Sequence, residues 1–261
     1  MEKISIQELI ASEQVRCALL ILNDGPKDFE GLALSLGTST KELPCITGPL
    51  EEHYLISEKN GIYALTRIGE LVVGKLKPLL CIEATMNAAE GFWGSRKLDF
   101  IPSPLLKKLH QLNSCTIIKP NFPDIYDYNR EVHEMSKSSG SVSVAAACLH
   151  PAFPKLFSEI LERRVNLSLI FDSCLFDKVR KDHDEHIRRL LENRKVELYV
   201  YAEGMPFLSF KVNDVCIELK LLTDKGTYDH KQLVCCSHDA VEWGKELFEH
   251  YRQQSVRVSA I

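Results

Sequence analysis

Residues 55–65 have the sequence LISEKNGIYAL, and this stretch decides the fold of the first part of the chain. Two short β-prone runs, Leu55–Ser57 and Ile62–Leu65, flank the connecting residues 58–61, Glu-Lys-Asn-Gly. An Asn-Gly pair between such runs is a strong signal of a tight hairpin, because both residues tolerate positive φ. The stretch therefore predicts a two-stranded antiparallel hairpin.

Helical patterns precede this hairpin. In the first, apolar residues spaced i, i+3, i+4 and i+7 share one helical face: Val15, Ala18, Leu19 and Leu22. Asp28 is placed to cap a second helix, which we expect Gly37 to end. The hydroxyls of Thr38, Ser39 and Thr40 are expected to cap a third helix, with inward positions Leu43, Ile46 and Leu50.

Helix, glycine turn, helix and hairpin is the order of a winged helix-turn-helix, whose later helix enters the major groove of DNA. The residues expected to contact DNA lie on the turn, on that helix and on the wing: Thr38, Ser39, Thr40, Lys41, Thr47, Lys59 and Asn60. Hydroxyls can meet base edges, whereas lysines mainly hold phosphates. The alternative is a winged helix used only for protein contacts.

Two features oppose simple DNA binding. Residues 1–78 contain 8 Lys and Arg against 11 Asp and Glu, a net charge of −3, although phosphate neutralisation supplies much of the affinity for DNA. In addition, Pro44, Gly48 and Pro49 fall within the recognition helix, so that helix must begin late or bend.

The domain boundaries expected from these patterns are a winged helix over 1–78, a helical linker over 79–94 and a regulatory domain over 95–261. A helical apolar pattern continues past the wing, from Leu71 to Ala89, with Pro78 inside it. One domain's core does not need so long an apolar stripe, so we expect part of it to face a second copy in a homodimer. Packing against the chain's own second domain is the alternative.

Residues 95–261 are expected to form an α/β domain with a mixed sheet. The predicted strands are 115–118, 141–147, 165–171, 196–201, 208–212 and 215–221, and the predicted helices are 154–164, 172–192 and 240–253. Strand, helix and strand within about 30 residues imply a parallel crossover. The short link Asn213-Asp214 implies an antiparallel hairpin.

No set of catalytic residues emerges from this second part, so we expect no enzyme, no cofactor and no metal. The sequence lacks a GxGxxG, a phosphate loop, a GxSxG and an HExxH motif. The segment Asp229-His230-Lys231-Gln232 does not contain the His-x-Lys of phospholipase D enzymes. A degenerate phosphodiesterase or nuclease is the alternative of another class.

Two further groups of residues are candidates for function. Aromatic residues in the last third, beside the polar residues Glu218, Lys220 and Asp229, could wall a pocket for a small-molecule effector, although strand aromatics more often form core: Tyr199, Tyr201, Phe207, Phe210, Tyr228 and Trp243. Nine cysteines without a CxxC pattern argue against a disulfide framework and for reduced, buried thiols. The alternative is a thiol switch at the adjacent pair Cys235 and Cys236.

Composition gives no sign of a membrane protein. The formal net charge is −4, and no apolar run reaches the ~20 residues of a membrane span. The beginning Met1-Glu2 is not that of a signal peptide, and we expect a cytoplasmic protein with no membrane partner.

The chain resembles archaeal winged-helix transcription regulators with a C-terminal methanogenesis regulatory protein middle domain, and among them the Methanosarcina-specific regulators. The resemblance lies in Trp93–Arg96, in His150–Pro154, in Gly226–Asp229 and in the ending Ala240–Tyr251. It implies a homodimeric, sequence-specific regulator of promoter DNA with a sensor domain similar in outline to phospholipase D enzymes that lack their catalytic residues. The predicted fold class is therefore α+β, with an N-terminal winged helix-turn-helix followed by a mixed-sheet α/β sensor domain.

Overall fold

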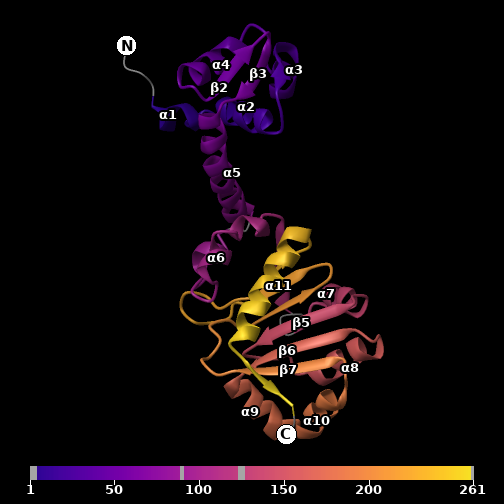
Figure 1. The fold of residues 1–261 in the computed structure, drawn as a ribbon. Coiled ribbons are helices and arrows are strands. Elements are labelled where there is room, and N and C mark those ends of the chain that lie inside the picture. Colours follow the sequence, from indigo (N-terminus) through magenta and orange to yellow (C-terminus); the bar gives the residue numbers. More distant parts are fainter. Residues whose placement is uncertain (1–4, 89–90, 123–126, 260–261) are drawn as a thin grey trace. The chain divides into compact units, whose positions relative to one another are not determined.

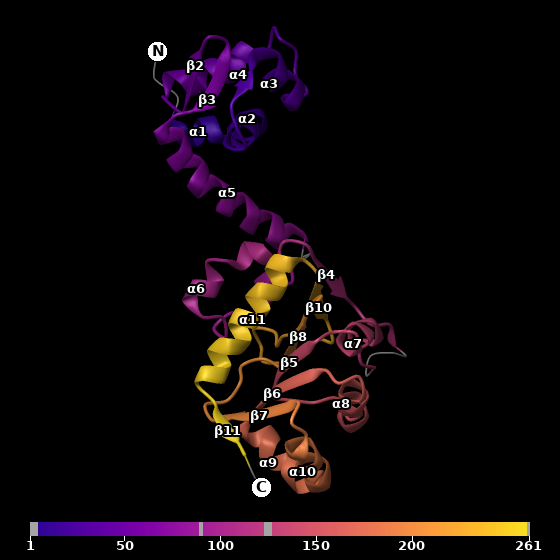
Figure 2. The ribbon, with the colours of Figure 1, turned by 45° about the vertical axis from the view of Figure 1, so that its right-hand side comes forward.

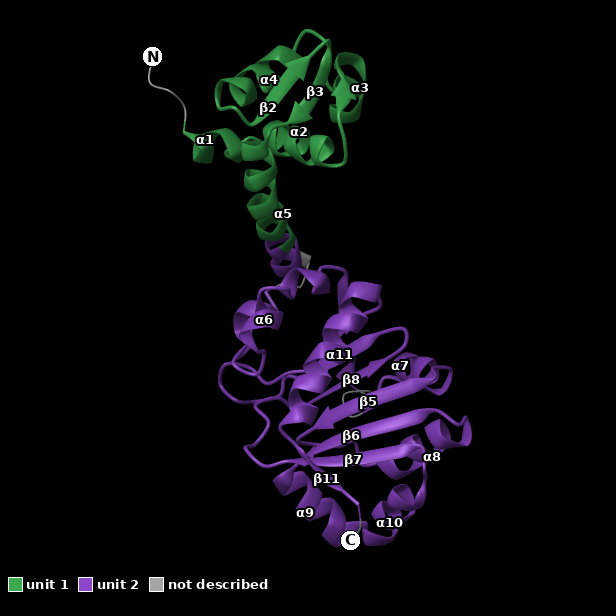
Figure 3. Cartoon of the chain, in the orientation of Figure 1, with its two compact units in different colours: residues 1–81 green, residues 82–261 purple. Residues whose placement is uncertain are grey.

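The computed structural model describes residues 5–88, 91–122 and 127–259. The chain divides into two compact units, Met1–Cys81 and Ile82–Ile261 (Figure 3). The first unit has its own hydrophobic core, and the second unit has separate cores on the two faces of a large sheet.

The first unit is a winged helix (Figure 1). Its elements in chain order are α1 (Ile6–Ala11), α2 (Glu13–Asn23), β1 (Lys27–Asp28), α3 (Phe29–Leu36), α4 (Leu43–Glu52), β2 (Ile56–Lys59), β3 (Ile62–Leu65) and the start of α5 (Arg67–Ala88). The three strands form one antiparallel sheet in the order β1-β3-β2. The predicted winged helix-turn-helix is thus confirmed.

Local chemistry explains most of these boundaries. Asp28 Oδ1 accepts a hydrogen bond of 2.7 Å from the Gly31 amide, which caps α3 as the sequence predicts. Gly37 ends α3 with a left-handed φ of 63°. At the hairpin, Asn60 and Gly61 have φ values of 55° and 78°, as expected for Asn-Gly in a tight turn.

The start of α4 differs from the prediction. Its N-cap residue is Glu42, which makes no side-chain capping bond, and the hydroxyls after Gly37 do not cap the helix. The helix begins at Leu43, so Pro44 falls in the first turn, where no backbone N–H is needed. The predicted late start is therefore confirmed, whereas the predicted hydroxyl cap is wrong.

The second unit contains an eight-stranded mixed sheet in the order β11-β7-β6-β5-β8-β9-β10-β4. Its strands are β4 (Cys115–Ile118), β5 (Ser141–Ala146), β6 (Asn166–Asp172), β7 (Val196–Tyr201), β8 (Ser209–Asn213), β9 (Ile217–Lys220), β10 (Gln232–Cys235) and β11 (Val256–Val258). The strands β5, β6 and β7 run parallel, and the other pairs are antiparallel. The predicted mixed sheet and its parallel crossover are confirmed.

Helices cover both faces of this sheet (Figure 2). The long α11 (His238–Gln253) packs on one face, together with α6 (Ser103–Leu106) and the short helices η1 (Trp93–Ser95) and η2 (Leu109–Leu112). The helices α8 (Phe153–Glu162), α9 (Ser173–Asp182) and α10 (Asp184–Glu192) pack on the other face, and α7 (Arg130–Lys137) lies beside α8. Neighbouring residues on a strand therefore belong to opposite cores, as Ala145 and Ala146 do.

Parts of this unit depart from the sequence prediction. The single helix expected over 172–192 is two helices, α9 and α10, which meet at His183. The strands β10 and β11 and the helix α7 were not predicted. Ala89, at the end of the predicted linker stripe, lies outside the described residues. No helix in the described ranges is both long enough and apolar enough to cross a membrane.

Candidate functional site

The turn between α3 and α4 is the first candidate site. Ser39, Thr40 and Lys41 are exposed and Thr38 is half-buried, so the turn is open to a partner. Glu42 lies within the same turn, and its Oε2 accepts hydrogen bonds from Thr38 Oγ1 at 3.1 Å and Ser39 Oγ at 2.9 Å. These bonds, led by the one from the Ser39 hydroxyl, lower the pKa of Glu42, so a negative charge stands beside the predicted DNA contacts.

One predicted DNA contact on α4 is wrong. Thr47 is buried in the first unit, only 3% exposed, because it lies four residues after Leu43 and therefore on the inward face. The outward face of α4 presents Pro44, Cys45, Glu51 and Glu52, none of which is a cation. The outward face of α4 therefore offers no cation to a phosphate, and the predicted lysines Lys41 and Lys59 lie on the flanking turn and on the wing.

The wing supplies a second exposed group. Lys59 ends β2 and Asn60 follows it at the turn, and both are exposed. A wing tip with a lysine and an amide side chain can contact phosphate or a minor-groove edge. Six of the seven predicted contact residues are thus at least partly accessible, and Thr47 is not.

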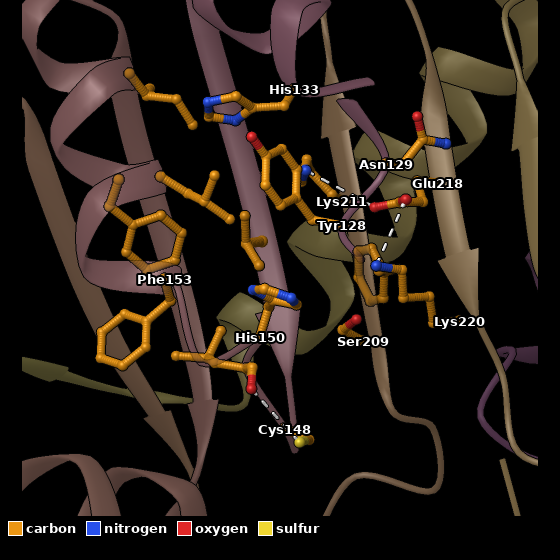
Figure 4. Close-up of a pocket in the computed structure, with 16 residues that line it drawn as sticks. Tyr128, Asn129, His133, Cys148, His150, Phe153, Ser209, Lys211, Glu218 and Lys220 are labelled. Atoms are coloured by element: carbon orange, nitrogen blue, oxygen red, sulfur yellow. Dashed lines mark hydrogen bonds and ion pairs between the residues drawn. The ribbon is translucent and has the colours of Figure 1, made fainter. Parts of the chain in front are cut away.

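The second candidate site is a cavity of about 70 Å³ on the α7 and α8 side of the sheet (Figure 4). Its lining comes from α7 and the residues before it, the loop after β5, α8, and the strands β5, β8 and β9. The lining residues are Tyr128, Asn129, His133, Val144, Cys148, Leu149, His150, Phe153, Leu156, Phe157, Ile160, Ser209, Phe210, Lys211, Glu218 and Lys220.

Charged side chains form the sheet wall of this cavity. Glu218 is paired with Lys211 across β8 and β9, and its carboxylate lies 3.7 Å from Lys211 Nζ and 3.6 Å from Lys220 Nζ. The Glu218 side chain is 5% exposed, and those of Lys211 and Lys220 are 20% and 17% exposed. Burial lowers the pKa of Lys211, and the neighbouring Glu218 carboxylate opposes this shift.

The helical wall is held by a separate contact. His133 on α7 lies 2.7 Å from Glu159 Oε2 on α8, and this hydrogen bond lowers the pKa of Glu159. The Tyr128 ring packs edge-on against both His133 and His150. These contacts fix α7 against α8 and the loop after β5.

The pocket predicted from aromatic residues is a different place and is wrong for most of its members. Five of the six are packed into the sheet cores, where burial of the rings stabilises the fold, and Tyr228 is half-buried: the five are Tyr199, Tyr201, Phe207, Phe210 and Trp243. The indole of Trp243 donates to the Leu105 carbonyl, so its polar atom is used internally. Of the six, only Phe210 borders the cavity of the second candidate site, and its ring packs into the core on the α11 side of the sheet.

The sequence indicated Glu218 and Lys220 as polar groups of a pocket, but sequence reasoning missed Lys211 and the face of the sheet on which the cavity lies. In residues 209–212 and 217–220, serine, lysine and glutamate alternate with apolar residues. Such alternation normally indicates a strand with one buried face and one solvent-exposed face. Here α7 and α8 cover that face, which sequence alone does not reveal.

The cysteine prediction is corrected by the sheet. Cys235 on β10 lies opposite Cys115 on β4, and these two form a disulfide with their Cα atoms 4.2 Å apart. The expectation of reduced, buried thiols is therefore wrong at this pair. The expected burial is also wrong for five free thiols, which are exposed: Cys17, Cys45, Cys148, Cys174 and Cys236. Cys236 is a free, exposed thiol, so Cys235 and Cys236 are not joined. Within the described residues no group of three or more potential metal ligands occurs.

Comparisons with known proteins place the second unit in a family. Residues 125–254 match the family model of the methanogenesis regulatory protein FilR1, middle domain. Over 254 residues the chain is 23% identical to methanogenesis regulatory protein FilR1 of Methanothrix harundinacea (strain 6Ac), covering 95% of this chain. The chain spans 57% of the length of that relative.

Two solved structures show weaker likenesses. TrmBL2, an archaeal chromatin protein with a novel mode of DNA binding, is 13% identical, with 97% of each chain covered and a TM-score of 0.45. Nuc of Salmonella typhimurium, a phospholipase D family member, is 12% identical over 56% of this chain and 99% of that chain, with a TM-score of 0.41. At these TM-scores neither likeness assigns a fold or a function. By the match over residues 125–254, the second unit of this chain carries the methanogenesis regulatory protein FilR1 middle domain.

Proposed function

We propose that the chain is a sequence-specific, DNA-binding transcription regulator that acts as a homodimer and responds to a signal at its second unit. The observation that carries this proposal is the exposed turn Ser39–Lys41 at the start of α4 in a winged-helix unit. The relationship to a protein named as a methanogenesis regulator supports it, and favours a regulator over an enzyme.

The proposed contacts divide by chemistry. Lys41 and Lys59 hold phosphates, and Ser39, Thr40 and Asn60 meet base edges or the sugar-phosphate backbone. The Ser39 hydroxyl donates to Glu42, so it meets DNA as an acceptor unless that bond breaks. The Glu42 charge would repel a phosphate placed too close, and thus selects the docking position.

Homodimerisation is supported by apolar residues on α5. Leu71 is 72% exposed and Leu79 is 60% exposed, whereas Val73 and Leu76 of the same helix are buried in the core of the first unit. Two winged helices must lie about 34 Å apart to contact successive major grooves, which a dimer provides.

The experiment that tests the function needs no knowledge of the operator. The full chain is incubated with sheared genomic DNA from its source organism, and the retained fragments are sequenced. We expect a small set of enriched promoter fragments. Uniform retention of all fragments, or of none, contradicts sequence-specific binding, and the latter favours a winged helix for protein contacts.

Lys41→Ala tests the position of the interface. We expect weaker binding on every DNA sequence and a salt dependence reduced by about one unit, because one phosphate contact is lost. The measurement is the affinity for an enriched fragment over a series of salt concentrations. The matched control is Lys195→Ala, which removes an exposed lysine of the second unit. An unchanged slope for Lys41→Ala removes that residue from the interface.

A further inference from the structure

Charged residues line an interior face of the sheet, where apolar residues are the norm. Lys211 on β8 and Glu218 and Lys220 on β9 face the helices α7 and α8, while their strand neighbours Phe210 and Leu219 face α11. Taking charges out of water is costly unless each is paired. The fold nevertheless keeps three charged side chains in this place, where little water reaches them. We therefore expect a role in binding that offsets the cost of their burial.

The charges on this wall do not cancel. Two lysines share one carboxylate, since both Lys211 and Lys220 lie within 4 Å of Glu218. The lysines therefore exceed the carboxylate by one positive charge. The Glu159 carboxylate on α8 does not balance this charge, because it contacts His133 at 2.7 Å. A bound group with one negative charge would complete the pairing.

Two polar atoms at the cavity also lack hydrogen bonds. Within the described residues, Glu218 Oε1 and Asn129 Nδ2 are buried and have no hydrogen-bond partner. Asn129 uses its side-chain oxygen to cap α7, which leaves the amide nitrogen free to donate. A buried polar atom without a partner costs roughly 1–3 kcal/mol. An anionic group can accept a hydrogen bond from Asn129 Nδ2, whereas Glu218 Oε1 is itself an acceptor and needs a water or a ligand hydroxyl as its donor.

The opposite wall is apolar and the space is small. Phe153 and Leu156 of α8 and Val144 of β5 form part of it. The volume of about 70 Å³ has room for several water molecules, each of which needs about 10–15 Å³. The cavity therefore suits a few non-hydrogen atoms with one charged end and one apolar end.

We propose that this cavity binds a small organic anion, either a short-chain carboxylate or a small phosphate ester. Its anionic group lies between Lys211 and Lys220, and its short carbon chain lies toward Phe153. Binding itself is independent of the proposed function. Only the role of the anion as a regulatory signal rests on DNA binding by the first unit.

Binding is tested on the full chain without DNA. The melting temperature is measured with acetate, butyrate, inorganic phosphate or glycerol phosphate, at constant ionic strength set with sodium chloride, and dissociation constants follow by calorimetry. Butylamine, of similar size to butyrate but cationic, is the ligand control. We expect stabilisation by at least one anion and none by butylamine. A response to carboxylates alone or to phosphates alone decides between the two sources of negative charge.

Variants of opposite expected effect separate binding from damage to the fold. Lys220→Met should weaken anion binding about tenfold or more, because a charge-assisted contact is lost. Glu218→Gln should strengthen it, because the carboxylate that competes for both lysines is removed while the shape is kept. Lys195→Met, at an exposed lysine of the same unit, should leave the affinity unchanged.

No anion effect, or equal loss in Lys220→Met and Lys195→Met, overturns the proposal. The affinity for an enriched DNA fragment is then measured with and without the bound anion. Anion binding without any change in DNA affinity keeps the site and rejects its regulatory role. Anion binding by a chain that retains no DNA contradicts the proposed function alone.

Discussion

The absence of a side chain at Gly69 allows the start of α5 to pack directly against the backbone at Leu55, shortly after α4. It lies in the first turn of α5, and a Cβ atom added there would lie 1.9 Å from the Leu55 carbonyl oxygen. The same oxygen accepts the Thr66 amide at 3.0 Å, and the Thr66 hydroxyl caps α5 by accepting from the Gly69 amide at 3.1 Å. The backbone after α4 and the start of α5 therefore touch directly, which only glycine permits.

Gly69→Ala is expected to destabilise the first unit by roughly 1–3 kcal/mol, because the added methyl must displace backbone. Gly74→Ala is the control in the same helix, since a Cβ at Gly74 meets no heavy atom within 4 Å. That control should be neutral or stabilising by up to about 1 kcal/mol, as alanine is the better helix former. Chemical denaturation of both variants checks this, and equal effects would contradict the close contact.

Residues with local roles could be predicted from sequence, and residues with distant partners could not. Asp28, Gly37 and Asn60 act within a few positions of themselves, and each was found in its predicted role. Thr47 was misplaced even though its spacing from Leu43 already put it on the buried face. Lys211 and Glu218 gave no local sign of burial, because the helices that cover them are distant in sequence.

The strands β4 and β10 show what sequence patterns leave open at the scale of an element. β4 was predicted correctly over Cys115–Ile118, but its partner β10 lies more than a hundred residues later, and the pairing follows from the fold. β4 is one of the two edge strands of this sheet, and within the described residues it pairs with β10 and no other strand. The disulfide between Cys115 and Cys235 fastens this edge.

Reduction of this disulfide should destabilise the second unit by roughly 2–5 kcal/mol, because the bond closes a long loop, with a sequence separation of 120. The measurement is the melting temperature with and without dithiothreitol. Cys115→Ser should abolish the response to reductant, whereas Cys236→Ser should retain it, since Cys236 is a free thiol. A response that vanishes in Cys236→Ser would instead favour the switch at Cys235 and Cys236.

At the scale of the whole molecule, the homodimer remains a proposal. It rests on the apolar pattern in the sequence of α5 and on the exposed leucines of that helix. The fold class of each unit could be predicted from the spacing of apolar residues within the chain. Dimer formation depends on contacts with a second chain, which that spacing does not specify. Leu71 and Leu79 on α5 are the residues on which the prediction depends.

Leu71→Glu is expected to shift the chain from dimer to monomer and to weaken binding to a two-half-site DNA fragment at least tenfold. A charge in an apolar interface leaves an unpaired buried group, which costs several kcal/mol. Lys77→Glu, at an exposed position on another face of α5, is the control. Light scattering coupled to size-exclusion chromatography reports the mass, and a monomeric unaltered chain at working concentration would refute the assignment.

The contact at Gly69 has a mechanical consequence. The Thr66 hydroxyl donates to backbone carbonyls of Tyr54 and Leu55, directly after α4, so the start of α5 and the end of α4 are locked at three neighbouring points. A rotation of the start of α5 about its axis is therefore expected to carry the end of α4 with it, because the contacts at Tyr54 and Leu55 join the two helices.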